Sequence, residues 1–191
     1  MVVRIVIASL MASVLMMAWG WFFWGFSGIP SKYIDRLPEE KDAVAAIRRH
    51  IAEPGMYHAP YWPAEKNPEA CQAYQERVKA GPLLWIIYHA GEDMQDPIVY
   101  VRGFVHMIAM TLLAGGLLAM AAPRLPSYPA RFGFVVVIGL LAATVALSDA
   151  VWFHHPWDFQ LMVAGSALVS WILTALVLAL LVKSPPPVVT G

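Results

Sequence analysis

The chain has 191 residues, of which 59% are hydrophobic and only 14% are charged. Because a soluble domain has about 25% charged residues, this composition excludes an ordinary water-soluble protein and indicates an integral membrane protein. Lys plus Arg and Asp plus Glu number 13 each, so the chain lacks the positive field that binds nucleic acid. The single cysteine, Cys71, excludes an internal disulfide and a cysteine-based zinc or iron–sulfur site.

Four apolar segments are long enough to cross a hydrocarbon core about 30 Å thick, which takes about 20 residues. The predicted spans are 5–26, 98–122, 132–153 and 157–182. The first follows a basic start, as in a secretory signal, but its end "WGWFFWGF" replaces the small residues of a cleavage site. We therefore predict a retained anchor and a membrane all-α fold, a bundle of four transmembrane helices.

The segment between the first two spans resembles folded soluble sequence. "LPEEKDAVAAIRRHIAEPG" predicts a helix that begins at Pro38 and ends at Pro54-Gly55. "GMYHAPYW" and "GPLLWIIYHAG" predict short strands, and "PEACQAYQERVKAG" predicts a second helix closed by Gly81. Asp96 and Pro97 then predict the cap and first residue of the second span. We expect this segment to fold as a small α+β cap that packs on the membrane helices or on a partner, since so short a segment barely buries a core of its own.

This pattern divides the chain into four parts. They are transmembrane helix 1 (1–26), the cap (27–97), transmembrane helices 2–4 (98–183) and a disordered cytoplasmic tail (184–191).

The basic residues that flank the spans predict the orientation of the chain. Arg4, Arg124, Arg131 and Lys183 fall on one side of a chain that crosses four times. Because such residues are retained in the cytoplasm, we predict cytoplasmic termini and an extracytoplasmic cap in the inner membrane of a bacterium. Arg102, at the outer end of the second span, is the exception, although its long side chain can reach the interface.

The stretch "SDAVWFHHPWDF" joins the third and fourth spans. Pro156 suits the first turn of a helix with His155 as its cap residue, and the two tryptophans suit the aromatic belt of a membrane. A tight turn therefore explains every residue except Asp149.

Asp149 and His106 are two ionisable residues that lie within the spans. Asp149 lies about 6 Å within the third span and His106 about 12 Å within the second. Because such groups are costly in a membrane and usually functional, we expect them to be partners. The pair would either handle a proton or hold a ligand, or would form a structural hydrogen bond that fixes helix register.

Other side chains at the same end are of types that bind Zn, Cu or Fe. The candidate metal ligands are His154, His155 and Asp158, which His58, His89 and Asp149 could join. No regular histidine spacing supports the set. A haem on His106 alone is a further alternative, whereas a dihaem site is disfavoured because the paired histidines lie about 12 Å from His106 along the membrane normal.

Small residues in the last three spans predict close approach of helices. They are Gly115, Gly116, Gly133, Gly139, Gly165, Ser166 and Ser170. The simplest interpretation is packing within the bundle, and any surplus face could dock onto another membrane subunit.

The chain resembles a group of uncharacterised bacterial inner-membrane proteins of similar length. The motifs that carry the resemblance are "MAWGWFFWG", "LPEEKDAVAAIRRHIAEPGMY", "AGPLLWIIYHAGEDM", "YPARFGFVVVIGLLA" and "WFHHPWDF". The resemblance covers nearly the whole chain. It implies the fold and localisation of the chain only, since no activity is established for that group. His154 and His155 depart from the aromatic or small residues expected there, so no family role is transferred to them.

Without a nucleophile–base set, a phosphate loop or a charged path in the sequence, we predict a non-enzymatic accessory or scaffold subunit. Its partners would be the other subunits of a larger inner-membrane complex, respiratory or photosynthetic. The alternative is a membrane redox or ligand-binding protein for quinone, haem or a metal, with His106 and Asp149 at its site. A small transporter is disfavoured because inverted repeats and broken helices are not evident.

Overall fold

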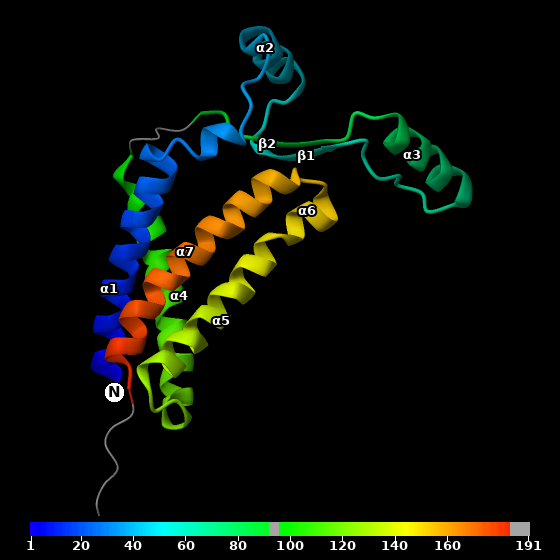
Figure 1. Cartoon of the computed structure of the whole chain (residues 1–191). Helices are drawn as coiled ribbons and strands as arrows, with labels where there is room; N and C mark the ends of the chain where they lie inside the picture. The colour runs from blue at the N-terminus through cyan, green and yellow to red at the C-terminus, as the bar shows by residue number, and fades with distance from the viewer. Residues whose placement is uncertain (92–95, 184–191) are drawn as a thin grey trace, which may run out of the picture. The chain divides into compact units, whose positions relative to one another are not determined.

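The structure is a computed structural model that describes residues 1–91 and 96–183. It divides into two compact units (Figure 1): Met1–Asp35 with Asp96–Gly191, which we name the bundle unit, and Arg36–Gln95, which we name the loop unit. In the described residues the bundle unit is helical, and the loop unit holds two helices and two strands. The predicted helical fold with a small sheet is confirmed, and the position of a cap over the bundle stays a prediction. The predicted tail, 184–191, lies outside the described residues.

Four segments of the bundle unit are long and apolar enough to cross a membrane, which confirms the predicted spans to within a few residues. Their helices are α1 (Val2–Trp21), α4 (Pro97–Ala121), α5 (Tyr128–Ala146), α6 (Ser148–Phe153) and α7 (Trp157–Leu181). Shorter turns are the π-helical η1 (Phe22–Phe26), which continues α1, and the 3₁₀ turns η2 (Pro30–Lys32) and η3 (Ala122–Arg124). By length and composition, the chain is a multi-pass membrane protein.

Side-chain caps fix where two of these helices begin. The Asp96 carboxylate accepts a hydrogen bond from the backbone N–H of Ile98 at 2.9 Å, and Pro97 is the first residue of α4, as predicted. The Ser127 hydroxyl accepts one from the N–H of Ala130 at 3.3 Å at the start of α5. Each cap satisfies a backbone donor that has no partner inside the helix.

The third span is interrupted near one end, where α5 gives way to α6. The N–H of Leu147, between the two helices, bonds the carbonyl of Thr144 at 3.1 Å. The Thr144 hydroxyl in turn donates to the carbonyl of Leu140 at 2.8 Å. Such back-bonding bends helices. Because no Pro or Gly marks the position, the apolar pattern predicted one continuous helix there.

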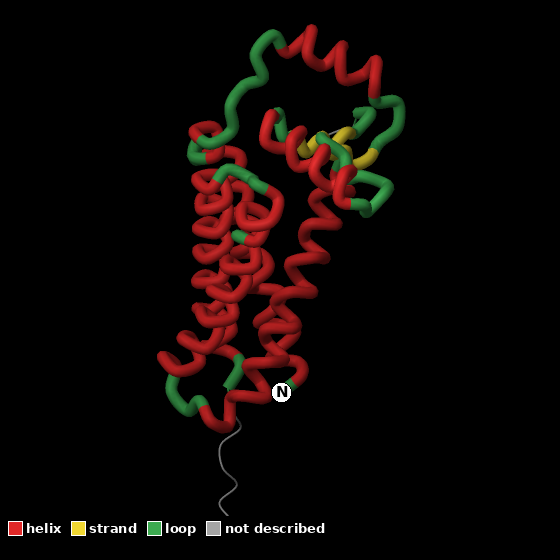
Figure 2. The backbone as a smooth tube through the Cα atoms, turned by 90° about the vertical axis from the view of Figure 1, so that its right-hand side faces the viewer, coloured by secondary structure: helices red, strands yellow, loops and turns green. Residues whose placement is uncertain are grey.

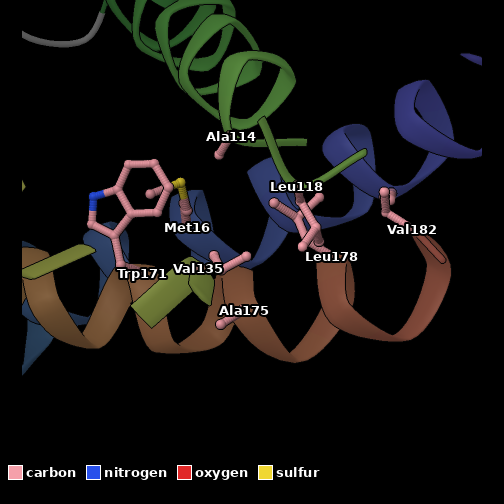
Figure 3. Packing of buried hydrophobic residues seen from close by; sticks show 9 residues of the cluster. Met16, Ala114, Leu118, Val135, Trp171, Ala175, Leu178 and Val182 are labelled. Atoms are coloured by element: carbon pink, nitrogen blue, oxygen red, sulfur yellow. The ribbon is translucent and has the colours of Figure 1, made fainter. Parts of the chain in front are cut away.

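The helix α7 lies at the centre of the bundle unit. It packs extensively against α5 and α1, and α1 packs against α4, whereas α4 touches α5 and α7 only slightly. Figure 3 shows the buried apolar cluster that these helices share. Its members are Ala8, Met16, Ala114, Leu118, Val135, Trp171, Ala175, Leu178 and Val182. The chain thus builds one core around α7 and leaves α4 at its edge.

Two of the predicted glycines allow close helix packing. Gly139 of α5 lies against Trp171 of α7, and Gly115 of α4 faces Ile5 of α1, whose side chain would be 3.0 Å from a Cβ on the glycine. At three other predicted positions a Cβ would meet no atom within 4 Å: Gly116, Gly133 and Gly165. Those three glycines are not needed for packing within the described structure.

Buried hydroxyl groups join α1 to α4. The oxygens of Ser13 and Thr111 lie 2.9 Å apart, and the Thr111 hydroxyl is 3.1 Å from the carbonyl of Ser9. All three residues are fully buried. Hydrogen bonds between helices help to hold membrane bundles together, because the hydrophobic effect does not drive helices together within lipid. Sequence reasoning did not predict this contact.

The N-terminus and the α4–α5 loop lie at the same end of the bundle unit in Figure 1, and Figure 2 shows the N-terminal end after a quarter turn. Arg131, in the first turn of α5, is buried. Its Nε donates to the carbonyl of Ala179 at 2.9 Å. Its Nη1 donates to the carbonyls of Leu125 and Pro126 at 3.1 and 2.8 Å. The free carbonyls of a helix C-terminus carry partial negative charge, so this cation fastens the loop to the last turn of α7.

The strands of the loop unit form an antiparallel pair. The strand β1 (Gly55–Ala59) pairs with β2 (Leu84–Tyr88), and Met56 stands opposite Ile87. The helix α3 (Pro68–Ala80) lies between them in sequence and closes at Gly81, as predicted. Both strands lie within the segments that the sequence predicted.

The helix α2 (Glu40–His50) is shorter than predicted at both ends. Glu39 takes a left-handed conformation, with φ 44°, so the helix begins after it and not at Pro38. Its last residue precedes the predicted Pro54-Gly55 stop, because Ile51 is already extended. Every described residue from 36 to 91 is at least partly exposed, so the loop unit has no fully buried core of its own.

Candidate functional site

The segment between α6 and α7 is a tight turn. His154 takes the left-handed conformation, with φ 58°, and the backbone N–H groups of His154 and His155 both donate to the carbonyl of Asp149. Pro156 is the residue that precedes α7. The prediction that His155 caps this helix is therefore wrong by one residue, because the proline completes the turn instead of starting the helix.

The side chains of this turn make local contacts. Nδ1 of His155 lies 2.8 Å from the amide nitrogen of the buried Gln160, which ties the ring to the first turn of α7. The carboxylate of Asp158 accepts a hydrogen bond from the N–H of the next residue, Phe159, at 2.8 Å. His154 is exposed. Among the described residues, the structure gathers no three His, Cys, Asp or Glu side chains that could hold a metal ion.

The structure does not join His106 to Asp149. Asp149 lies half-buried on α6 and His106 lies exposed on α4. In the part of the chain that the structure describes, neither side chain makes a hydrogen bond or ion pair. The roles predicted for the pair therefore find no direct contact to support them within one copy of the chain.

His106 belongs instead to an exposed face of α4. Five residues recur along this face at alternating intervals of three and four positions. We name this set the α4 seam: His106, Ala109, Leu113, Gly116 and Met120. Leu113 and Met120 are 72% and 73% exposed. One turn before His106 stands the exposed Arg102. The seam lies on the side of α4 away from Thr111 and Gly115, which face α1.

A shallow apolar groove runs between α1 and α4. It has a volume of about 470 Å³ and is lined by Val14, Met17, Ala18, Trp21, Tyr100 and Phe104. Sequence reasoning missed it, although Tyr100 and Phe104 are one helical turn apart and so share a face. Its size falls in the range of about 300–1,000 Å³ that is typical of small-molecule sites.

Comparison with models of known families, with curated proteins and with solved structures finds no match. The resemblance drawn from the sequence motifs therefore stays a prediction. What the chain can do must be argued from its own residues.

The loop unit carries one aromatic cluster that the sequence did not single out. The ring of His58 stacks on that of Trp62, with centroids 4.7 Å apart, and lies 4.2 Å from that of Trp85. Nδ1 of His58 is buried and has no hydrogen-bond partner among the described residues. His89, the other candidate ligand of this unit, is exposed. The cluster orders the strand pair and the loop after β1.

Proposed function

We propose that this chain is a non-catalytic accessory or scaffold subunit of a larger membrane complex. The observation that carries the proposal is the exposure of the loop unit, in which every described residue is at least partly open to solvent. A segment of this kind gains little free energy from its own burial. It acquires a stable structure when another surface covers it.

The elements of the loop unit are individually weak. Its helices have 11 and 13 residues, whereas isolated helices shorter than about 12–15 residues are marginal in water. A lone two-stranded sheet is also marginal. The opposed residues Met56 and Ile87 are 63% and 80% exposed and leave one sheet face apolar. A partner subunit that covers this face would supply the missing burial.

The orientation that we propose places both termini in the cytoplasm of a bacterium and the loop unit outside its inner membrane. Its support is the set of basic residues at one end of the bundle: Arg4, Arg124, Arg131 and Lys183. Such residues are retained on the cytoplasmic side. Reporter fusions after Lys66 and after Lys183 should report opposite compartments, and the same compartment for both would overturn this orientation.

The subunit role is tested by extraction from native membranes in a mild detergent, followed by native electrophoresis. We expect the chain to migrate in a band much larger than its own 21.1 kDa mass plus micelle. Substitution of Ile87 by Asp should shift it to the position of the free chain, with His50→Asp as a control on an exposed polar site. A free chain under every mild condition would contradict the proposal.

A second candidate function is the binding of a membrane-soluble ligand such as a quinone. The apolar groove between α1 and α4 favours it, with Trp21 and Tyr100 as polar-tipped aromatic residues at the groove. Organic extraction of the purified protein and an optical spectrum test this role. Ala18→Trp, which fills the groove, should abolish any co-purified quinone, and a quinone-free, colourless preparation of the unaltered protein would remove this candidate.

A further inference from the structure

The α4 seam and the neighbouring Arg102 place two ionisable side chains on an exposed face of a helix long and apolar enough to cross a membrane. His106 precedes Ala121 by 15 residues, a distance of about 22 Å along the helix, so it lies well within a hydrocarbon core about 30 Å thick. Arg102 stands one turn further out. Both side chains are exposed, and within the described chain neither makes an ion pair or hydrogen bond. Such groups usually face a protein partner or a water-filled cavity.

The rest of the seam has the form of a helix–helix contact. Its residues repeat at the three- and four-residue intervals by which two helices mesh along their length. Ala109 and Gly116 are small, and a Cβ on Gly116 would meet no atom within 4 Å. Small residues let membrane helices approach closely. Because α4 uses its opposite side against α1, the seam is free for a further helix.

We propose that the α4 seam docks a transmembrane helix of a different polypeptide, one that carries a carboxylate at the depth of His106 and Arg102. The inference rests on the proposed subunit role and names the chemistry of the partner. The guanidinium of Arg102 carries a permanent positive charge and only donates hydrogen bonds. His106 can donate as well. A carboxylate accepts from both and neutralises the charge.

The charges on α4 also argue against a second copy of this chain as the docking partner. The helix α4 contains no Asp or Glu from Pro97 to Ala121. Two copies related by a two-fold axis along the membrane normal would bring Arg102 toward Arg102 across the seam. Like charges that face each other near the membrane interface, where the Arg102 side chain lies, repel each other. A seam-to-seam pair of two copies therefore supplies no carboxylate, and we assign the carboxylate to another polypeptide.

Site-specific photocrosslinking in native membranes, before any detergent, tests the proposal. Leu113 of the full chain is replaced by benzoylphenylalanine, and Val137, which is 62% exposed on α5, serves as the control position. Crosslinked peptides are identified by mass spectrometry. We expect adducts from position 113 alone, with a peptide of a second polypeptide that contains Asp or Glu inside an apolar segment.

The variants His106→Leu and His106→Gln separate recognition from mere proximity. Loss of the hydrogen bond in His106→Leu should lower the adduct yield about three- to tenfold, and Gln, which still donates, should restore most of it. Equal yields at positions 113 and 137, a partner peptide without an acid, or adducts between two copies of this chain would each overturn the proposal. If the chain migrates in the large native band but gives no adduct at position 113, the proposed subunit role stands and the proposal that the α4 seam docks a helix is wrong.

Discussion

Gly139 of α5 packs directly against the stem of the Trp171 side chain of α7. A Cβ placed on Gly139 would lie 2.8 Å from Cγ of Trp171 and closer still to its Cβ. The Cβ atom of Trp171 is fixed to the backbone of α7, so no rotation of the side chain can relieve the clash with that atom. Gly139→Ala should therefore force α5 and α7 apart and destabilise the bundle by about 1–3 kcal/mol, despite the better helix propensity of Ala.

Reversible unfolding in mixed detergent micelles measures this effect. Gly133→Ala is the matched control, because the same change on the same helix meets no atom within 4 Å. It should leave stability unchanged or raise it slightly. Equal losses for the two variants would show that the glycines act through flexibility of α5 and not through its contact with Trp171.

The hydroxyl contact between Ser13 and Thr111 should be measurable as a coupling energy between α1 and α4. Ser13→Ala and Thr111→Val, singly and together, form a double-mutant cycle in which Val preserves the shape of Thr. We expect a coupling of about 0.6 kcal/mol and at most about 1.7 kcal/mol, the range of hydrogen bonds between membrane helices. Thr144→Val is the control, since the one hydrogen bond of that hydroxyl among the described residues is to the carbonyl of Leu140 in its own helix. A coupling of zero would remove the contact as a determinant of helix pairing.

Local signals in the sequence predicted the ends of several elements correctly. Asp96 and Pro97 were identified because a cap and a first-turn proline act on the nearest backbone groups and need no knowledge of the tertiary fold. Gly81 was identified for the same reason, since its positive φ closes α3. The apolar length of the spans likewise depends on composition alone.

The contacts between helices could not be predicted in the same way. His106 and Asp149 were paired on the assumption that their helices are neighbours, but α4 packs mainly on α1, and Asp149 lies on α6 beyond a break at Leu147. The order of helices in a bundle depends on which faces fit together, and four uniformly apolar spans give no strong face preference. The sequence analysis used Arg131 only to predict the orientation of the chain. Its hydrogen bond to α7 could not be predicted, because the acceptor lies 48 residues away in sequence.

Replacement of Arg131 by Lys should weaken the junction between the α4–α5 loop and α7. One ammonium group cannot reach the carbonyl of Ala179 and those of the loop at once, as the planar guanidinium does. A hydrogen bond from a charged group contributes about 1.5–3 kcal/mol, so we expect a loss in that range. Thermal denaturation in detergent and the rate of proteolysis in the loop measure it. Arg124→Lys is the control, an exposed site without a side-chain hydrogen bond in the described structure, and an equal effect there would contradict the assignment.

Hydrogen exchange of the intact chain should show that the loop unit is ordered by a partner. In the free, detergent-purified chain, amides of α2 and α3 should exchange within seconds to minutes, because local opening costs little where few apolar groups are buried. The same amides should be protected at least tenfold when the chain is exchanged within the native complex, which corresponds to about 1.4 kcal/mol of added stability. Amides in the middle of α7, the centre of the buried cluster, provide the internal control and should exchange slowly in both samples. Protection of α2 and α3 already in the free chain would mean that the loop unit is covered by its own chain, and the argument for a partner on that surface would fail.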